Sequence, residues 1–305
     1  MGPDPGSLPL SEKDKYSGSG PVPRRVFLPG VTLSIVGFGG LMLKGMNQDE
    51  TDCLVAESVS QGVNYFDVAP EYDEGGAEKR LGSALEPYRK DLFLAGKTLA
   101  RSAGAARREL EQSLRRLKTD YFDLYQFHAV NTAKDLESIF APGGALRTFL
   151  SAREEGLVRY LGFSSHSVPL SLAMLDRFQF DAILFPINYV CYARGNFGPQ
   201  VMAKARACGV ARVALKALAY TPMPHSQVRR YPNCWYRPID DPVLALQALR
   251  FSLSEDVSAV LPPSDVRLYR MALSLAHAVT PLSAEERRDL LDNARGLKPI
   301  MKAKK

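Results

Sequence analysis

The sequence has few cysteines, no long apolar run and no extended basic cluster. No window holds the roughly 18 apolar residues that a membrane span needs, and no basic run is longer than the C-terminal residues 302–305. The cysteines form no Cys-x-x-Cys pair and lack the spacing of zinc ligands. We therefore expect no metal, no membrane and no nucleic-acid partner, and scattered reduced thiols at Cys53, Cys191, Cys208 and Cys234.

The composition is that of an ordinary soluble globular chain. Of its 305 residues, 46% are hydrophobic and 24% are charged, which excludes a mainly disordered, collagen-like or coiled-coil protein. The net charge of +6 and the pI near 9.1 suit an anionic ligand, but spread over this length they do not indicate nucleic-acid binding.

The chain divides into three expected parts. Residues 1–23, rich in Gly, Pro and Ser, are predicted to be a flexible leader, residues 24–300 a single domain, and residues 301–305 a basic tail. Arg24-Arg25 resembles a twin-arginine export signal, but glycines interrupt the following apolar stretch and no A-x-A cleavage site follows. We interpret the arginine pair as coincidental and expect a cytoplasmic protein.

Strand-like and helix-like segments alternate along the domain. A capping-box pattern, Ser283 with Glu286, predicts an additional C-terminal helix. The predicted strands are 33–37, 64–68, 92–97, 121–128, 160–164, 182–187, 213–218 and 258–261. The predicted helices between and after them are 50–60, 77–85, 103–118, 135–155, 170–177, 198–207, 242–253 and 266–278.

Strands that each precede a helix indicate a parallel sheet with helices outside. Eight such units over the domain favour a (β/α)8 TIM barrel over a doubly wound open sheet. The glycine-rich segment 37–40 (GFGG) is not a G-x-G-x-x-G dinucleotide motif, and we expect no helix directly after it. In a barrel, the active-site residues lie where the strands end.

Polar residues follow three consecutive predicted strands. Asp67, Lys97 and His128 stand at strand ends, and Tyr72 lies on the loop after Asp67. A lysine ammonium stabilises a phenolate and lowers the pKa of a nearby tyrosine, an aspartate keeps that lysine charged, and a histidine can hydrogen-bond a substrate oxygen. Taken one at a time, each of these residues has a purely structural interpretation. The tyrosine could be an ordinary aromatic residue of a loop, the histidine a core residue, and the Asp–Lys pair a structural ion pair. Their grouping on adjacent strand ends favours a catalytic role.

Several segments resemble the aldo-keto reductase family. They are residues 37–40 (GFGG), 64–72 (NYFDVAPEY), 78–82 (EKRLG), 96–98 (GKT), 113–128 (SLRRLKTDYFDLYQFH) and 156–165 (GLVRYLGFSS). The resemblance spans about residues 25–300 and implies hydride transfer between a nicotinamide cofactor and a carbonyl or alcohol. It places Asp67, Tyr72, Lys97 and His128 on the family's catalytic tetrad, with Tyr72 as the general acid.

The second half of the chain departs from the family pattern. The resemblance assigns Gly39 to the cofactor site and puts Ser164 and Ser165 where a Ser-Asn pair usually holds the nicotinamide carboxamide. Leu184 replaces a Gln, and Lys216 replaces an aromatic residue that often stacks on the nicotinamide. Lys216 can instead pair with a cofactor phosphate, or it can extend out of the barrel.

The adenosine end and the substrate lid are also divergent. Ser264, Arg267 and Arg270 follow the last strand, where the family binds the 2′-phosphate; we expect NADPH, with NADH as an alternative. The same arginines also fit ordinary surface residues. Two unusual segments, 189–200 and 221–238, should overhang the mouth. These segments contain four residues that could bind a polar or anionic ligand such as a sugar or keto acid: Tyr192, Arg194, Trp235 and Arg237. The same four residues equally fit ordinary packing of the lid.

We therefore predict an NAD(P)H-dependent oxidoreductase that interconverts a small-molecule carbonyl, including aldehydes, ketones and sugars, and an alcohol. Two alternatives stay open: a sugar dehydrogenase working in the oxidative direction, and a nicotinamide-binding regulatory barrel with little turnover.

Overall fold

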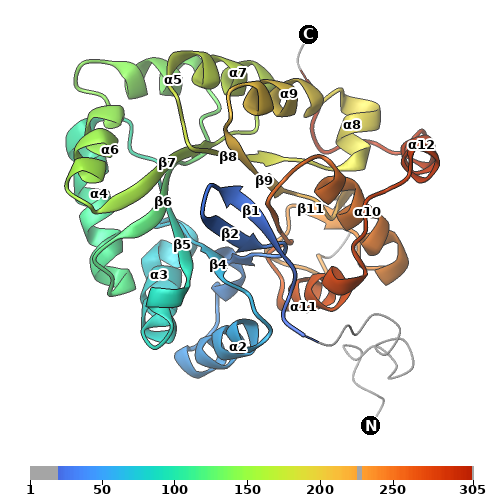
Figure 1. The fold of residues 1–305 in the computed structure, drawn as a ribbon, viewed down its shortest axis with the longest axis horizontal. Helices are drawn as coiled ribbons and strands as arrows, with labels where there is room; N and C mark the ends of the chain where they lie inside the picture. The colour runs from blue at the N-terminus through green and yellow to red at the C-terminus, as the bar shows by residue number, and fades with distance from the viewer. Residues whose placement is uncertain (1–19, 225–228, 304–305) are drawn as a thin grey trace.

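The computed structural model describes residues 20–224 and 229–303 and shows an eight-stranded parallel sheet rolled into a barrel (Figure 1). The sheet order follows the chain, and Val36 pairs in parallel with Val260 where its two edges meet. The barrel strands are β3 (Phe38–Gly39), β4 (Tyr65–Asp67), β5 (Phe93–Thr98), β6 (Phe122–Phe127), β7 (Val158–Ser164), β8 (Ala182–Pro186), β9 (Ala211–Leu215) and β12 (Ala259–Leu261). The (β/α)8 architecture predicted from the sequence is thus confirmed.

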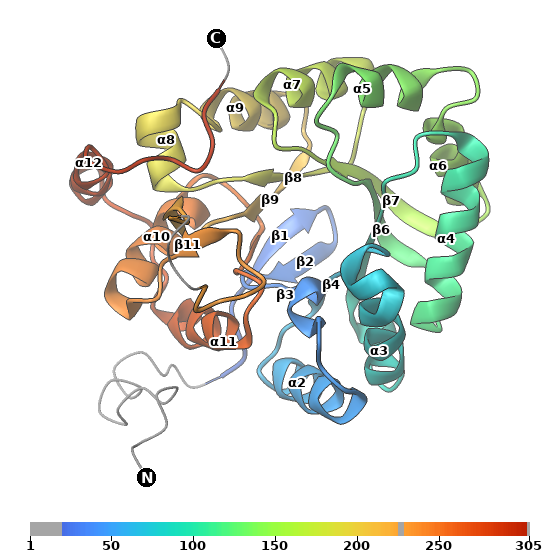
Figure 2. The ribbon, with the colours of Figure 1, turned by 180° about the vertical axis from the view of Figure 1, so that it is seen from behind.

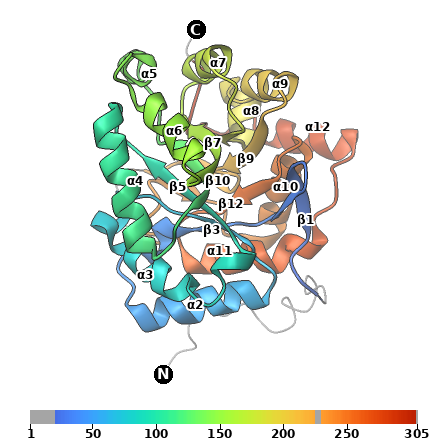
Figure 3. The ribbon, with the colours of Figure 1, turned by 60° about the vertical axis from the view of Figure 1, so that its left-hand side comes forward.

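The helices surround the barrel (Figures 1 and 3). Helix α4 buries Ala106, Leu110 and Leu114 along one face, as its apolar periodicity predicts. The helices are α2 (Gln48–Ser60), α3 (Gly76–Leu85), α4 (Ala103–Leu117), α5 (Ala133–Phe140), α6 (Ala145–Glu154), α7 (Val168–Arg177), α8 (Tyr189–Gly195), α9 (Pro199–Ala207), α10 (Pro242–Ser254), α11 (Val266–Leu275) and α12 (Ala284–Asn293). Short 3-10 turns are η1 (Gly40–Leu43), η2 (Tyr72–Gly75), η3 (Arg89–Asp91) and η4 (Ala276–Ala278).

Three expectations about elements need correction. The single helix expected over 135–155 is two helices, α5 and α6, because Pro142, Gly143 and Gly144 interrupt the helical periodicity. The strand expected over 213–218 is β9, which already ends at Leu215. The turn η1 directly follows β3, where we expected no helix. The capping box of Ser283 and Glu286 is present at the start of α12, as predicted.

The strand expected over 33–37 is also wrong in its role. Residues 24–34 form an antiparallel hairpin of β1 (Arg24–Leu28) and β2 (Val31–Ser34), which lies across the end of the barrel facing the viewer in Figure 1. The guanidinium of Arg25 donates hydrogen bonds to the backbone oxygens of Leu253 and Val257. The arginine pair thus belongs to a folded element that covers the N-terminal ends of the strands.

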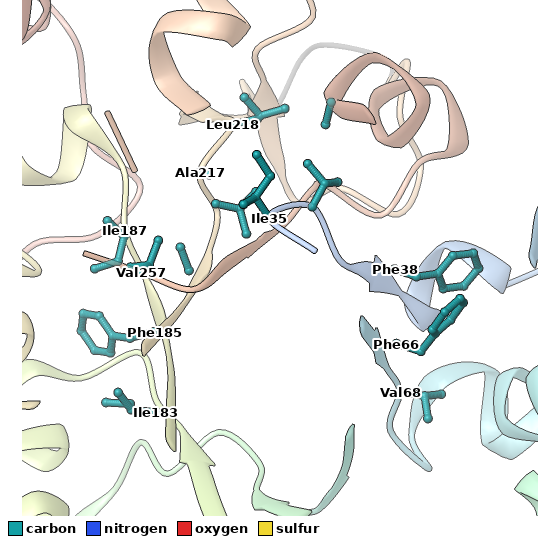
Figure 4. Close-up of a cluster of buried hydrophobic side chains, with 14 of the residues drawn as sticks. Ile35, Phe38, Phe66, Val68, Ile183, Phe185, Ile187, Ala217, Leu218 and Val257 are labelled. Carbon is teal, nitrogen blue, oxygen red and sulfur yellow. The ribbon is translucent and has the colours of Figure 1, made fainter. Parts of the chain in front are cut away.

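Two apolar layers stabilise the barrel. Inside it, Phe27 from the hairpin packs with strand residues such as Phe93 and Leu124. Between the sheet and the helices lies the larger layer, in which Phe66 and Phe185 point away from the barrel axis (Figure 4). Successive strand residues point to opposite faces of the sheet, so each strand contributes to both layers.

A second hairpin, which the sequence did not predict, lies at the opposite end (Figure 2). It consists of β10 (Ala219–Pro222) and β11 (Tyr236–Pro238), and it follows β9 after a turn in which Lys216 adopts a left-handed φ of +62°. Residues 225–228, between its strands, lie outside the described residues. The hairpin therefore covers the end of the barrel at which the sequence predicts the active site.

Most of the expected leader and the last two tail residues lie outside the described residues. Within the described part, Val22 is buried and its backbone N–H donates to Gln61 O at 2.7 Å. At the other end, the backbone N–H of Ala303 donates to Gly195 O at 2.8 Å. None of the helices in the described ranges combines the length and the hydrophobicity that crossing a bilayer requires.

Candidate active site

A cavity of about 210 Å³ opens at the C-terminal ends of the strands. It is lined by side chains from most of the barrel strands and from the β10–β11 hairpin region. Nine residues predicted from the sequence line it together: Gly39, Asp67, Tyr72, Lys97, His128, Ser164, Lys216, Trp235 and Ser264. This is the end of a TIM barrel that carries chemistry.

The floor of the cavity holds a buried ion pair. Asp67 ends β4, Lys97 lies near the end of β5, and the ammonium of Lys97 donates to Oδ1 of Asp67. Gln126 donates to Oδ2 of the same carboxylate at 3.2 Å. Burial is the largest single influence and lowers the pKa of Lys97, but the interactions with Asp67, Tyr72 and Glu71 together outweigh it and hold this pKa above its ordinary value. Lys97 is therefore an ammonium at neutral pH.

Tyr72 is held beside this pair by the turn η2. The two residues after it, Asp73 and Glu74, have φ near +55° and +53°, and Asp73 accepts a hydrogen bond of 2.5 Å from Arg80. The Lys97 ammonium lies 5.2 Å from the centroid of the Tyr72 ring. Burial raises the pKa of Tyr72; Lys97 acts in the lowering direction expected from the sequence but does not outweigh it. The phenol therefore keeps its proton at neutral pH.

His128 lies edge-on to Tyr72, with their ring centroids 6.0 Å apart. Its Nδ1 is 3.2 Å from a carboxylate oxygen of Glu71. A carboxylate only accepts hydrogen bonds, so Nδ1 carries the proton in this contact. His128 lowers the pKa of Glu71 against the opposing effect of burial. Nε2 is thus the ring nitrogen left to contact a ligand in the cavity that His128 lines.

The predicted carboxamide-binding serines have different surroundings. Ser164 lines the cavity, and its Oγ accepts the backbone N–H of Ala129 at 2.9 Å, which leaves its own proton free to donate. Ser165 does not line the cavity, and its hydroxyl donates to Val130 O at 2.7 Å. Of the pair, only Ser164 is placed to contact a ligand in the cavity.

The two arginines expected near the 2′-phosphate already have carboxylate partners. Arg267 pairs with Asp265 at 2.8 Å, and Arg270 pairs with Glu57 at 2.6 Å. Neither lines the cavity, whereas Ser264 does. A phosphate would therefore compete with Asp265 or Glu57 for these guanidinium groups.

The four expected lid residues separate into two groups. Trp235 lines the cavity with about 46% of its surface exposed. The others lie outside the lining: Tyr192 packs edge-on against Phe251, Arg194 is in the last turn of α8, and Arg237 lies over the Tyr220 ring. The hairpin thus brings one of the four to the cavity.

Three polar residues that line the cavity were not predicted from the sequence. His166 follows the paired serines after β7, and Asn233 and Tyr236 flank Trp235. Position after a strand end was a usable signal for His166. No sequence pattern indicated that Asn233 and Tyr236 reach the cavity, because their position depends on the pairing of β10 with β11.

The described residues contain no group of three or more His, Cys, Asp or Glu side chains placed to hold a metal ion.

Lys216 lines the cavity from the turn after β9, and its backbone oxygen accepts a hydrogen bond from Asn188 at 3.2 Å. Leu184, which stands where the family has a Gln, lines the same cavity.

Comparison with known proteins gives consistent results. Residues 35–234 match the model of the Aldo/keto reductase family. The chain is 31% identical over 170 residues to aldo-keto reductase YhdN of Bacillus subtilis, a match that covers 52% of this chain and 48% of the relative. The chain thus spans about half the length of the curated relatives it matches.

Solved structures extend the likeness over the whole barrel. Aldo-keto reductase AKR11C1 from Bacillus halodurans (holo form) superposes with a TM-score of 0.72 and 25% identity, covering 92% of this chain and 98% of that one. An aldo-keto reductase from Klebsiella pneumoniae in complex with NADPH has the same fold, with a TM-score of 0.67, 18% identity and coverage of 91% and 96%. By fold and by sequence, the chain belongs to the aldo/keto reductase family.

Proposed function

We propose that this protein is an NAD(P)H-dependent oxidoreductase that reduces a carbonyl group to an alcohol, with Tyr72 as the proton donor. The observation that carries the proposal is the convergence of Asp67, Tyr72, Lys97 and His128 on one cavity at the C-terminal end of the barrel. A protonated phenol beside a lysine ammonium is suited to donating a proton to a developing alkoxide.

The residues around the cavity fit a nicotinamide nucleotide. Gly39 lines the cavity, and a Cβ placed there would meet no protein atom within 4 Å, so the backbone leaves open space beside the strand end. The free proton of Ser164 can donate to a carboxamide oxygen, and Ser264 offers a hydroxyl at the same cavity. When bound, the nucleotide supplies the hydride for the reduction.

Tyr72 transfers its phenolic proton to the carbonyl oxygen as negative charge develops there. Lys97 stabilises the resulting phenolate, because its ammonium lies beside the ring and is kept protonated by Asp67. The buried position of the Asp67–Lys97 pair strengthens this electrostatic effect over its value in water. Asp67 is therefore a positioning residue for Lys97.

His128 orients the carbonyl oxygen. With Nδ1 engaged by Glu71, Nε2 is the ring nitrogen left to contact that oxygen. Glu71 was not singled out from the sequence, although it directly precedes Tyr72.

For the cofactor we propose NADPH over NADH. The support is the basic surroundings of the chain after β12, where Arg267 and Arg270 lie on α11, and the NADPH complex of the Klebsiella protein with the same fold. Binding of a 2′-phosphate would have to displace Asp265 or Glu57 from these arginines. We also propose a small-molecule aldehyde, ketone or sugar as substrate, and an oxidative direction as the alternative.

The test measures both directions with one preparation. NADPH and NADH oxidation is followed with a panel of aldehydes, ketones and sugars, and NADP⁺ and NAD⁺ reduction with the matching alcohols. Faster NADPH oxidation supports the reductase, and faster NADP⁺ reduction supports the dehydrogenase. Tight nucleotide binding without turnover would indicate a regulatory barrel, and absence of nucleotide binding would contradict the proposal.

A further inference from the structure

Lys216 stands out because it is a partly buried cation at the cavity with no carboxylate partner among the described residues. The cavity lining holds two lysines and a single carboxylate, Asp67, which is already paired with Lys97. The other carboxylates nearby, Glu71 and Asp265, are paired with His128 and Arg267. The charge of Lys216 is thus left uncompensated.

The surroundings of Lys216 are aromatic. Its ammonium lies 5.1 Å from the centroid of the Tyr236 ring and 5.8 Å from that of Trp235. Such contacts stabilise a cation by much less than an ion pair does in a buried site. Burial accordingly lowers the pKa of Lys216 to about 8, with Cys234 acting weakly in the opposite direction. The ammonium form still predominates at pH 7.

A second polar group without a partner faces the same space. Nε2 of His166 is buried and has no hydrogen-bond partner among the described residues. The pKa of His166 is lowered to about 4, mainly by burial and further by the charges of Lys216 and His128. Its ring is therefore neutral at pH 7. A neutral imidazole can donate one N–H, and a buried polar atom without a partner is costly.

The backbone holds Lys216 in this place at a conformational cost. Its φ of +62° is a left-handed conformation that non-glycine residues adopt only at an energetic cost. The turn is fixed because the Lys216 carbonyl accepts from both Ala219 N and Asn188 Nδ2. Strain of this kind is concentrated at functional sites.

We propose that Lys216 and His166 form an anion-binding subsite on the wall of the cavity, which takes a phosphate or carboxylate group of the bound ligand. The anion belongs either to the diphosphate of the nucleotide or to a carboxylate on the carbonyl substrate. An anion there pairs with the ammonium and accepts the N–H of His166. The subsite rests on the proposed function for its place in the reaction.

The only tryptophan of the chain gives a direct readout. Trp235 lies at the subsite, so its fluorescence reports occupancy without nicotinamide or turnover. The protein is titrated at constant ionic strength with inorganic pyrophosphate, with succinate and with neutral butane-1,4-diol, and each affinity is also measured by calorimetry. We expect saturable binding of at least one anion and none of the diol.

Three variants of lysine separate the charge from other effects. We expect Lys216→Met to weaken anion binding by roughly tenfold or more, and Lys216→Arg to restore most of it. Lys118→Met is the matched control, because Lys118 is also a lysine with a left-handed φ (+52°) but lies on the surface beside Glu86. His166→Leu should weaken binding with Lys216 intact.

Tighter binding of pyrophosphate identifies the nucleotide diphosphate as the source of the anion, and tighter binding of succinate identifies the substrate. No saturable binding, or unchanged affinity in Lys216→Met or His166→Leu, would overturn the subsite. Because no step of this titration requires hydride transfer, the subsite and the proposed reductase activity fail independently of each other.

Discussion

Two lysines face one cavity, Lys97 fully buried and Lys216 partly buried, and their surroundings shift their pKa values in opposite directions. Lys97 has Asp67 against its ammonium, and its pKa is raised. Lys216 has aromatic rings and no carboxylate among the described residues, and its pKa is lowered to about 8. Folding therefore favours the proton on Lys97 and disfavours it on Lys216, relative to the unfolded chain.

The first prediction concerns stability and pH. The pKa of Lys216 is about 8 in the folded chain, against an ordinary lysine pKa of 10.5, so between these pH values the unfolded chain binds more protons at Lys216. The loss of stability caused by the charged lysine is therefore full below pH 8 and disappears above pH 10.5. Lys216→Met should therefore raise the free energy of unfolding by about 1–3 kcal/mol at pH 7. Urea unfolding at several pH values measures this change.

The gain of Lys216→Met should diminish as the pH rises through that window. The titratable groups facing Lys216 are His166, Cys234 and Tyr236, and none of their values lies in the range from 8 to 10.5. Lys118→Met serves again as the control and should change stability by less than about 0.5 kcal/mol. A destabilised Lys216→Met protein at pH 7 would contradict this account of the cavity.

At the same scale, the sequence predicted the four convergent polar groups and the pairing of Asp67 with Lys97, but not the partners that the loops supply. Asp67, Lys97 and His128 were recognisable because strand ends meet at one rim of a barrel whatever the loops do. The contact of His128 with Glu71 and the turn that presents Lys216 depend on loop conformation. Loop φ values such as +62° are not specified by a lysine in the sequence.

At the scale of elements, close helix packing positions the strand ends. Helix α3, which follows the turn carrying Tyr72, approaches α4 at Gly82. A Cβ at Gly82 would lie 2.5 Å from Arg116 O and 2.6 Å from Leu117 Cα, both backbone atoms that cannot move aside cheaply. The glycine thus permits contact between the two helix backbones.

We therefore predict that Gly82→Ala destabilises the protein by about 1–3 kcal/mol despite the better helix propensity of alanine. Gly104→Ala on α4 is the matched control, because a Cβ there meets only the flexible end of Arg108, at 3.5 Å. That change should be neutral or stabilising by up to about 1 kcal/mol. Equal effects of the two changes in thermal unfolding would refute the packing argument.

Element boundaries were predictable where local chemistry sets them. The capping box of α12 and the apolar face of α4 are local features and were found. The β10–β11 hairpin was missed because its strands are separated by a long connection, and pairing over such a distance leaves no local pattern. The break between α5 and α6 was readable in Pro142 and the glycines after it, but apolar periodicity on both sides concealed it.

At the scale of the molecule, the N-terminal hairpin closes the end of the barrel opposite the active site. Phe27 inserts from β1 and packs edge-on against Phe93, with ring centroids 5.1 Å apart. Its neighbour Val26 is 68% exposed. Phe27 and Val26 lie on the same strand but differ in burial. Comparing substitutions at the two positions therefore separates the effect of core packing on stability from that of the hairpin conformation.

Phe27→Ala should destabilise the protein by about 3–5 kcal/mol, because it leaves a cavity inside the barrel. Val26→Ala should change stability by about 0.5 kcal/mol or less. Denaturant midpoints measure both. Turnover of the folded Phe27→Ala protein should remain close to wild type, since the active site lies at the other end; a specific loss of activity without a loss of stability would contradict this division of the barrel.

The barrel itself was predictable because eight strand–helix units leave few ways to bury both faces of a parallel sheet. The hairpins at the two ends of the barrel were not predictable. One consists of residues 24–34, which we interpreted from the sequence partly as an export-like motif and partly as the first barrel strand. The other uses a segment interrupted at 225–228, outside the described residues. Both hairpins add to the barrel rather than continue its alternation.

The proposed reaction depends most directly on one phenolic proton. The decisive measurement is kcat for NADPH oxidation with the best carbonyl substrate, in wild type, in Tyr72→Phe and in Tyr121→Phe. Tyr121 is the matched control, because its ring lies between Arg89 and Arg159 at the other end of β6. We predict a loss of about 10²–10⁴-fold in Tyr72→Phe with nucleotide affinity retained, and no loss in Tyr121→Phe. Equal kcat in Tyr72→Phe and wild type would contradict the assignment of Tyr72 as the proton donor.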